Sequence, residues 1–240
     1  MIQISTTPRI EYNETMNIHT VFTGVANAHI IENPRGVILV DAGMPHQARW
    51  IVGKIRALGH SPQAVRLILC THGHIDHAGS AVALKRLTGA PIALHRGDAR
   101  LVATSRLKIP PGRNRFINFT KWVMETFGWL APIETFTPDI LLEDGQSLRE
   151  FGMDARVIHT PGHTAGSISL AFDDGAVFVG DAILNLLRVS FPLYWEDPAS
   201  ARASACKIRA LQPRVLYSGH GRAFDARALD TFVGDHCDSK

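Results

Sequence analysis

The sequence of 240 residues predicts an α/β fold, and three observations support this prediction. Short, continuously apolar runs recur along the chain, as is typical of strands buried on both faces. Segments with helical periodicity separate several of these runs. Clusters rich in His, Asp and Gly follow several runs directly. We therefore expect buried sheets covered by helices, with functional side chains at the strand ends.

The first half of the chain is predicted to alternate strands and helices. Ile51, Ile55 and Leu58 are spaced i, i+4, i+7, which predicts an amphipathic helix. The run Val65–Cys70 is short and apolar, as expected of a buried strand. In order, we expect β-structure over 1–42, a helix over 46–58, a strand over 65–70, a helix after Gly79 and a strand over 91–95.

The second half repeats the arrangement of apolar strand and polar turn. Asp197 followed by Pro198 predicts a helix start, because Asp caps a helix and Pro fits its first turn. In order, we expect strands over 155–159, 167–172 and 176–179, a helix from Pro198, a strand over 215–217 and a short helix near 225–235.

Residues from about 100 to 140 interrupt this pattern. They include a predicted helix over 116–130 that is dense in aromatic side chains, among them Phe116, Phe119, Trp122 and Phe127. Three interpretations remain open: an insertion that packs on the core, a lid over an active site, or a contact with a second copy or a membrane surface. We expect one domain over residues 1–240 that carries this aromatic-rich insertion.

Composition narrows the class of protein. The net charge of +3 comes from scattered Lys and Arg residues, which does not favour a nucleic-acid surface. Residues 1–9 lack the pattern of a signal peptide, and the chain has no uncharged apolar stretch long enough for a membrane span. Three cysteines, Cys70, Cys206 and Cys237, indicate neither a disulfide framework nor a cysteine zinc module. These features predict a cytoplasmic protein.

The residues with the strongest chemical signal follow the strand over 65–70, in the motif Thr-His-Gly-His-Ile-Asp-His-Ala-Gly over 71–79. In an extended chain, His72, His74 and Asp76 would project the same way, and His77 would join them if the chain turned after Asp76. Imidazole and carboxylate groups suit zinc first, with iron or manganese as alternatives. One cluster cannot complete two metal shells, so further ligands are expected at later strand ends. Candidates in such turns are Asp41, His163, Asp181 and His220.

Together these motifs resemble those of the metallo-β-lactamase superfamily. They are His-x-His-x-Asp-His at 72–77, Thr-Pro-Gly-His-Thr at 160–164, Gly-Asp at 180–181 and Gly-His-Gly at 219–221, in the order found in that family. The resemblance spans about residues 18–222. It implies a four-layer αβ/βα sandwich with metal ions at one edge, between two sheets.

The resemblance also implies which residues bind two divalent metal ions. Asp181 would bridge the two ions, and Asp41 would orient ligand histidines from behind. The remaining ligands would be His72, His74 and His163 for the first ion, and Asp76, His77 and His220 for the second.

The function implied is that of a metal-dependent hydrolase in which a hydroxide bridging the metal ions attacks an ester, lactone or thioester of a small molecule. Asp76 and Asp181 are the expected catalytic carboxylates. The ligand set is similar to that of the dinuclear glyoxalase II and lactonase branch. Tyr194, Trp122 and Phe127 are candidates for the substrate pocket, and an apolar substrate is favoured over a phosphodiester.

Other interpretations of this resemblance remain. A phosphodiesterase of the same fold and a mononuclear-iron sulfur dioxygenase use related scaffolds, and a non-catalytic binding protein would be expected to have lost ligands. The aromatic segment also permits a homodimer.

Overall fold

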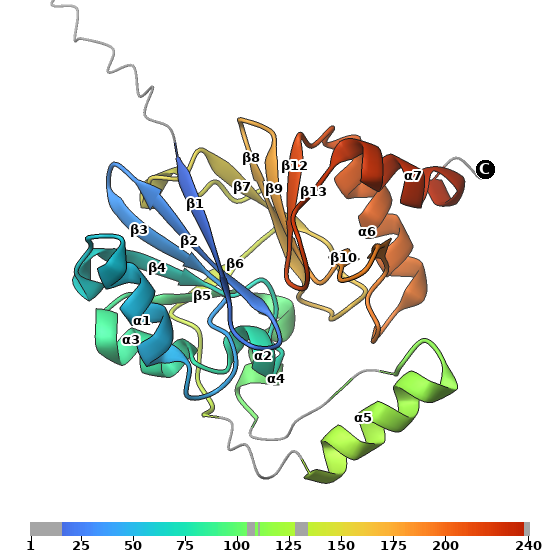
Figure 1. Ribbon diagram of the computed structural model, residues 1–240, viewed down its shortest axis with the longest axis horizontal. Coiled ribbons are helices and arrows are strands. Elements are labelled where there is room, and N and C mark those ends of the chain that lie inside the picture. Colours follow the sequence, from blue (N-terminus) through green and yellow to red (C-terminus); the bar gives the residue numbers. More distant parts are fainter. Residues whose placement is uncertain (1–15, 105–108, 110, 128–133, 238–240) are drawn as a thin grey trace, which may run out of the picture.

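A computed structural model describes residues 16–104, 109, 111–127 and 134–237. Figure 1 shows two sheets side by side, with helices on their outer faces. The expectations for residues 1–15, among them the first part of the predicted β-structure, and for 128–130 of the aromatic helix lie outside the described residues.

The first sheet has six strands in the order β1-β2-β3-β4-β5-β6. The pairs β1–β2 and β2–β3 are antiparallel, and the pairs from β3 to β6 are parallel. The strands are β1 (Asn17–Phe22), β2 (Asn27–Asn33), β3 (Gly36–Val40), β4 (Val65–Leu69), β5 (Ile92–His95) and β6 (Ile140–Leu142).

The second sheet has five strands in the order β13-β12-β9-β8-β7, and only β12–β9 is a parallel pair among them. A separate two-stranded hairpin pairs β10 (Leu184–Asn185) with β11 (Val189–Ser190). The strands of the second sheet are β7 (Ala155–His159), β8 (Ile168–Phe172), β9 (Ala176–Gly180), β12 (Val215–Ser218) and β13 (Phe224–Asp225).

Three hydrophobic cores hold four layers together. One lies between the first sheet and helices α1 (Ala48–Ala57) and α3 (Ala81–Thr88). A second lies between the two sheets. A third lies between the second sheet and helices α6 (Pro198–Ala210) and α7 (Ala226–Cys237), which cover its outer face in Figure 1. The predicted α/β sandwich is confirmed.

The continuously apolar strands follow from this layering. In β3, Leu39 packs toward α1 and α3, whereas Ile38 and Val40 pack between the sheets. In β4, Ile68 and Leu67 divide in the same way. Because successive side chains point to opposite faces and both faces are covered, the buried positions must be apolar; Arg66 of β4 is exposed and is the charged residue of that strand.

Residues predicted to begin or end helices do so in the structure. The side chain of Asp197 accepts a hydrogen bond from the N–H of Ala199, and Pro198 opens α6. Helix α3 ends at Gly89, whose φ of +79° is left-handed and favours glycine. The strands β6, β10, β11 and β13 were not predicted, because two or three residues are too few to show a period of two.

The expectation for the cysteines was wrong in one respect. Cys206 of α6 and Cys237 of α7 form a disulfide, with Cα atoms 5.5 Å apart. The two cysteines are 31 positions apart, which is not a recognisable spacing; the bond arises because the two helices pack side by side. Cys70 is free and buried in the first core, as predicted for a small apolar side chain. None of the described helices is both long and apolar enough to cross a bilayer.

The aromatic helix is present as α5 (Arg115–Phe127). Phe116, Phe119 and Trp122 are 71%, 58% and 59% exposed, so these three rings do not pack into a core. The segment before α5 joins the loop after β11, where the N–H of Arg113 donates to Leu193 O at 3.0 Å. Helix α5 is thus attached next to the loop that follows the small hairpin.

Candidate metal centre

The ligand-rich motif forms a turn and then a short helix. After β4, residues 71–74 bend, and α2 (Ile75–Ala78) follows. His72 and His74 lie in the turn, and Asp76 and His77 lie on α2. The expected extended alternation is therefore wrong; these side chains converge because the chain turns immediately after the strand.

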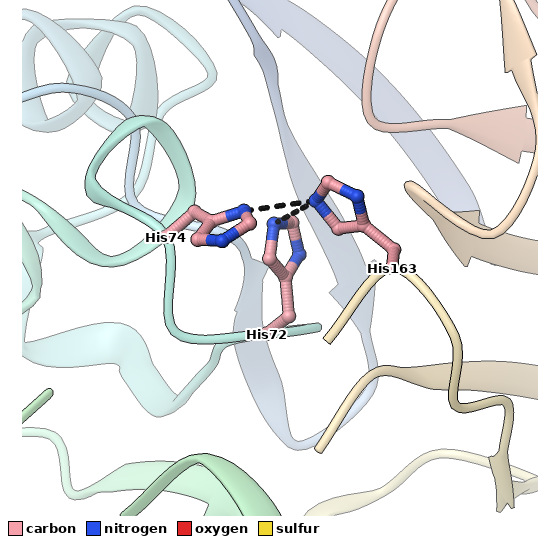
Figure 2. A group of neighbouring side chains, drawn as sticks. All are labelled: His72, His74 and His163. Carbon is pink, nitrogen blue, oxygen red and sulfur yellow. Dashed lines mark hydrogen bonds between the residues drawn. The ribbon is translucent and has the colours of Figure 1, made fainter. Parts of the chain in front are cut away.

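Three histidines form one group of candidate ligands. Nε2 of His163 lies 2.8 Å from Nδ1 of His74 and 3.2 Å from Nε2 of His72, and Figure 2 shows these nitrogens directed toward one another. His163 comes from the loop after β7, so the group joins the two sheets. Its donor atoms all lie within 4.8 Å of one another, close enough to hold one metal ion.

A second group contains Asp76, His77 and His220. Nε2 of His220 lies 3.3 Å from both Oδ2 of Asp76 and Nε2 of His77. Asp181, at the end of β9, lies between the two groups. Its Oδ2 is 3.2 Å from Nε2 of His220 and 3.5 Å from Nε2 of His163, and its Oδ1 is 3.4 Å from Nε2 of His77.

The donor set fits divalent cations. Nε2 of His74 and Oδ1 of Asp181 are buried and have no hydrogen-bond partner within the described residues. Buried polar atoms are normally satisfied, so such orphans point to a missing partner. Five imidazoles and two carboxylates are the ligands that zinc and iron prefer.

In three of the histidines, Nδ1 contacts an oxygen atom outside the cluster, so Nε2 is the ring nitrogen that faces the cluster. Nδ1 of His77 lies 2.8 Å from Oδ2 of Asp41, Nδ1 of His163 lies 2.7 Å from Tyr194 O, and Nδ1 of His220 lies 3.0 Å from Val25 O. Each Nδ1–H donates to its oxygen, which leaves the Nε2 lone pair for a cation.

Electrostatics divides the cluster into two halves. Burial lowers the pKa of His74 to about 3 and that of His72 well below its usual range, so these imidazoles are neutral. Burial also lowers the pKa of His77, but the charges of Asp181 and Asp41 outweigh it and raise the pKa to about 9. Asp181 and Asp76 likewise raise the pKa of His220 to about 11.

The pKa values of the carboxylates Asp181 and Asp76 are lowered, whereas those of His77 and His220 are raised. Burial alone would raise the pKa of Asp181 and Asp76, but the neighbouring His77 and His220 hold both well below the usual range. Both side chains are therefore ionised at neutral pH. A half that contains ionised carboxylates beside a half of neutral imidazoles offers ligands for cations.

Comparison with known proteins identifies the family. The family model of the metallo-beta-lactamase superfamily matches residues 21–220. The chain belongs to the metallo-beta-lactamase superfamily. It is therefore a metallo-hydrolase of that superfamily, and its two-sheet sandwich is the fold of the family.

Three relatives illustrate the range of this similarity. The chain is 27% identical to the "Probable metallo-hydrolase YflN" of Bacillus subtilis (strain 168), over 88% of this chain and 86% of that protein. It is 26% identical to "Hydroxyacylglutathione hydrolase GloC" of Haemophilus influenzae, over 80% and 83%. The crystal structure of TTHA1623 "in a di-iron-bound form" superposes with a TM-score of 0.66 at 25% identity, over 90% of this chain and 96% of that one.

Asp41 lies behind the superfamily motif and contacts one of the candidate ligands. It is 1% exposed, and its Oδ1 accepts a hydrogen bond of 2.7 Å from the N–H of Thr71 while Oδ2 accepts from His77. Its φ of +64° is unusual for a residue other than glycine. The left-handed backbone costs free energy, and the contacts with Thr71 and His77 hold it in place.

The candidate pocket residues Tyr194 and Trp122 lie beside or on helix α5. The hydroxyl of Tyr194 lies 2.7 Å from Oγ1 of Thr120, so it pairs with helix α5. Tyr194 contacts the cluster through its backbone carbonyl, which accepts from His163. Trp122 is exposed on α5, and the side chain of Phe127 lies outside the described residues.

One residue beside the site was missed in the sequence. Asp98 is 2% exposed and accepts hydrogen bonds from both ligand loops, through Gly73 and Thr164. The available signal was the one that identified Asp41, a carboxylate soon after a buried strand, here β5. Asp98 did not stand out because Arg96 and Gly97 separate it from His95, the last residue of β5.

Proposed function

We propose that this metallo-hydrolase binds two divalent metal ions and cleaves ester, lactone or thioester bonds in small substrates. The observation that carries the proposal is the position of Asp181, whose two oxygens lie within 3.5 Å of histidines from both candidate groups. A buried carboxylate with this reach can bridge two cations. His72, His74 and His163 would hold the first ion, and Asp76, His77 and His220 the second. The di-iron form of TTHA1623 supports two ions and keeps iron as a candidate beside zinc and manganese.

When bound, the ions would lower the pKa of a coordinated water and polarise the bond to be cleaved. Asp76 is the protein group best placed to handle the proton. Its side chain is 21% exposed, so it borders the open side of the cluster, and its low pKa keeps it ionised. As a carboxylate it would accept a hydrogen bond from the attacking water and orient it. Because Asp76 binds a proton weakly, it would pass that proton on to the leaving group.

The surroundings of His220 favour a substrate with an apolar part. The loop that carries His220 is bonded to two chain segments, through Val25 O and through the N–H of Asn185. Both segments present exposed apolar side chains: Val25 is 52% exposed, and Leu186 and Leu187 are 52% and 101% exposed. Exposed apolar side chains grouped beside a reactive site are typical of ligand contacts. An acyl chain or ring of an ester or thioester would cover them.

The test combines metal analysis with a substrate panel of lactones, thioesters, aryl esters, phosphodiesters and β-lactams. We expect close to two metal ions per chain and hydrolysis of the lactone, thioester or aryl ester members. Retention of both ions and full turnover in Asp181→Ala would show that Asp181 does not bridge them. One iron per chain with oxygen-dependent turnover would instead support a sulfur dioxygenase, and hydrolysis confined to phosphodiesters would support a phosphodiesterase.

A further inference from the structure

Asp98 connects the two loops that carry His72, His74 and His163. Its Oδ2 accepts a hydrogen bond of 2.8 Å from the N–H of Gly73, the residue between His72 and His74. The same oxygen accepts one of 2.7 Å from the hydroxyl of Thr164, the residue after His163. Its Oδ1 accepts one of 2.7 Å from the N–H of Gly166.

These loops come from different halves of the sandwich. Gly73 follows β4 of the first sheet, and Thr164 and Gly166 follow β7 of the second. Asp98 itself follows β5, in a short turn where Gly97 donates to Nδ1 of His95. Besides the backbone hydrogen bond of 2.9 Å from the N–H of Ile168 to Thr71 O, the buried carboxylate of Asp98 therefore joins two loops that lie on different sheets.

The backbones around Asp98 are packed without free space. A Cβ atom added at Gly166 would overlap the backbone of Asp98 and lie 2.6 Å from its carboxyl group. One added at Gly97 would lie 2.8 Å from Ala165 O. The rings of His95 and His159 stack beside this contact, with centroids 4.2 Å apart, and Nε2 of His159 lies 2.9 Å from Ala165 O. Small movements of Asp98 would therefore be transmitted to the loop of His163.

We propose that Asp98 is a positioning residue that sets the spacing of His72 and His74 relative to His163, and thereby the affinity of the first metal position. The inference rests on the metal binding in the proposed function but not on the substrate. Ligands held in place before binding lose less entropy when the ion arrives, and groups behind the ligands commonly change affinity by about 10-fold to 100-fold.

Asp41 provides a natural comparison, because the ligand that it contacts directly, His77, belongs to the other half of the cluster. It contacts Thr71 and His77, whereas the hydrogen bonds of Asp98 go to Gly73, Thr164 and Gly166. A change at Asp98 should thus affect the position that includes His163 and spare the position that includes His77 and His220.

The experiment measures zinc affinity by competition with a chromophoric chelator, in two backgrounds that each retain one position. His220→Ala keeps the group with His163, and His163→Ala keeps the group with His220. In the first background we expect Asp98→Asn to weaken zinc binding about 10-fold to 100-fold. In the second background we expect a change of less than about threefold. The stoichiometry of the unmodified chain tests the two-metal proposal separately, because the Asp98 inference depends only on ratios within one background.

Asp139→Asn is the matched control. Asp139 also accepts a backbone N–H, from Ile92 at 2.8 Å, but at the opposite end of β5. We expect it to lower the melting temperature of the metal-free protein without changing zinc affinity. Equal losses in both backgrounds, or the same loss in Asp139→Asn, would overturn the inference, because either result would mean that general stability sets the affinity.

Thr164→Val gives a milder test if Asp98→Asn does not fold. It removes one of the three hydrogen bonds to Asp98 and nearly conserves volume. We expect a smaller loss of zinc affinity in the His220→Ala background, and a less than additive loss when Asp98→Asn folds and the two are combined. Unchanged affinity in Thr164→Val and in every folded Asp98 variant would overturn the inference.

Discussion

The metal centre and helix α5 are neighbours that are built in opposite ways. His72, His77 and Asp181 are at most 6% exposed, and bonds from Asp41 and from backbone carbonyls fix the orientation of ligand rings. On α5, by contrast, Phe116 and Trp122 are more than half exposed. From this difference we expect two tasks: a centre preorganised for chemistry, and an apolar surface on α5 that adapts to a substrate.

The largest effect should come from Asp181, where the two halves of the centre meet. Asp181→Asn keeps the size of the side chain but removes the charge that both groups of histidines face. We expect kcat/KM to fall by more than about 100-fold, because loss of a direct ligand should exceed the usual effect of groups behind the ligands. Metal content, measured by elemental analysis, should fall below two ions per chain. Unchanged metal content and turnover would mean that the centre does not depend on a bridge.

The next effect should come from Asp41, which orients His77. Asp41→Asn places an amide N–H where either Thr71 or His77 now donates, so one hydrogen bond is lost. We expect about 10-fold to 100-fold weaker metal binding. In the metal-free protein the pKa of His77, now raised to about 9, should move down because one of its charged partners is gone. Titration of His77 by NMR measures this directly, and an unchanged pKa would contradict the assigned contact.

Substitutions on α5 should affect substrate preference without affecting metal binding. Helix α5 reaches the centre through Thr120 and Tyr194, whose carbonyl holds His163. We expect Trp122→Ser and Phe119→Ser to lower kcat/KM for long acyl chains, by up to about fourfold per methylene that loses contact, while short chains are hydrolysed normally.

Trp50→Ser is the control for this comparison, because Trp50 is 53% exposed on α1, on the outer face of the first sheet. It should leave the dependence on chain length unchanged. If the α5 variants and Trp50→Ser behave alike, the aromatic surface of α5 does not contact the substrate. The difference in exposure between the metal centre and α5 would then have no bearing on catalysis.

The smallest effect concerns pH and a histidine outside the ligand set. Burial lowers the pKa of His29 to about 3, so the folded protein leaves it neutral while the unfolded chain protonates it below about pH 6.5. Unfolding therefore takes up a proton in this window, and stability falls as the pH falls from about 6.5 toward 3. His29→Gln should reduce the slope by up to about 1.4 kcal/mol per pH unit, measured by denaturant unfolding with a chelator present. An unchanged slope would show that His29 does not titrate on unfolding.

Much of the fold could be predicted because buried strand positions require apolar side chains, and runs of such side chains can be recognised in the sequence. The run Val37–Val40 had to be apolar throughout, and the run 65–70 had to be apolar except at the exposed Arg66, since both faces of their sheet are covered elsewhere. The strands of two or three residues could not be predicted, because their pairing depends on neighbours brought close by the rest of the fold. The Cys206–Cys237 disulfide could not be predicted either, because it depends on the packing of α6 against α7.

The candidate site could likewise be predicted only in part. The ligand residues stand out by chemistry, since histidine and aspartate are uncommon directly after buried strands. Alternation in an extended chain predicts that these side chains converge, but in the structure they converge through a turn and through α2. Asp98 and the Tyr194–Thr120 contact link segments more than 60 residues apart, and no local pattern encodes such contacts.

The account is tested most directly by native mass spectrometry of the purified protein and of Asp181→Asn, with metal supplied in excess and then removed by dialysis. We predict two ions on the unmodified chain and fewer than two on the variant, with turnover of an ester or thioester substrate following the doubly loaded species. A single retained ion with full turnover, or two ions retained equally by both proteins, would contradict a bridged dinuclear centre.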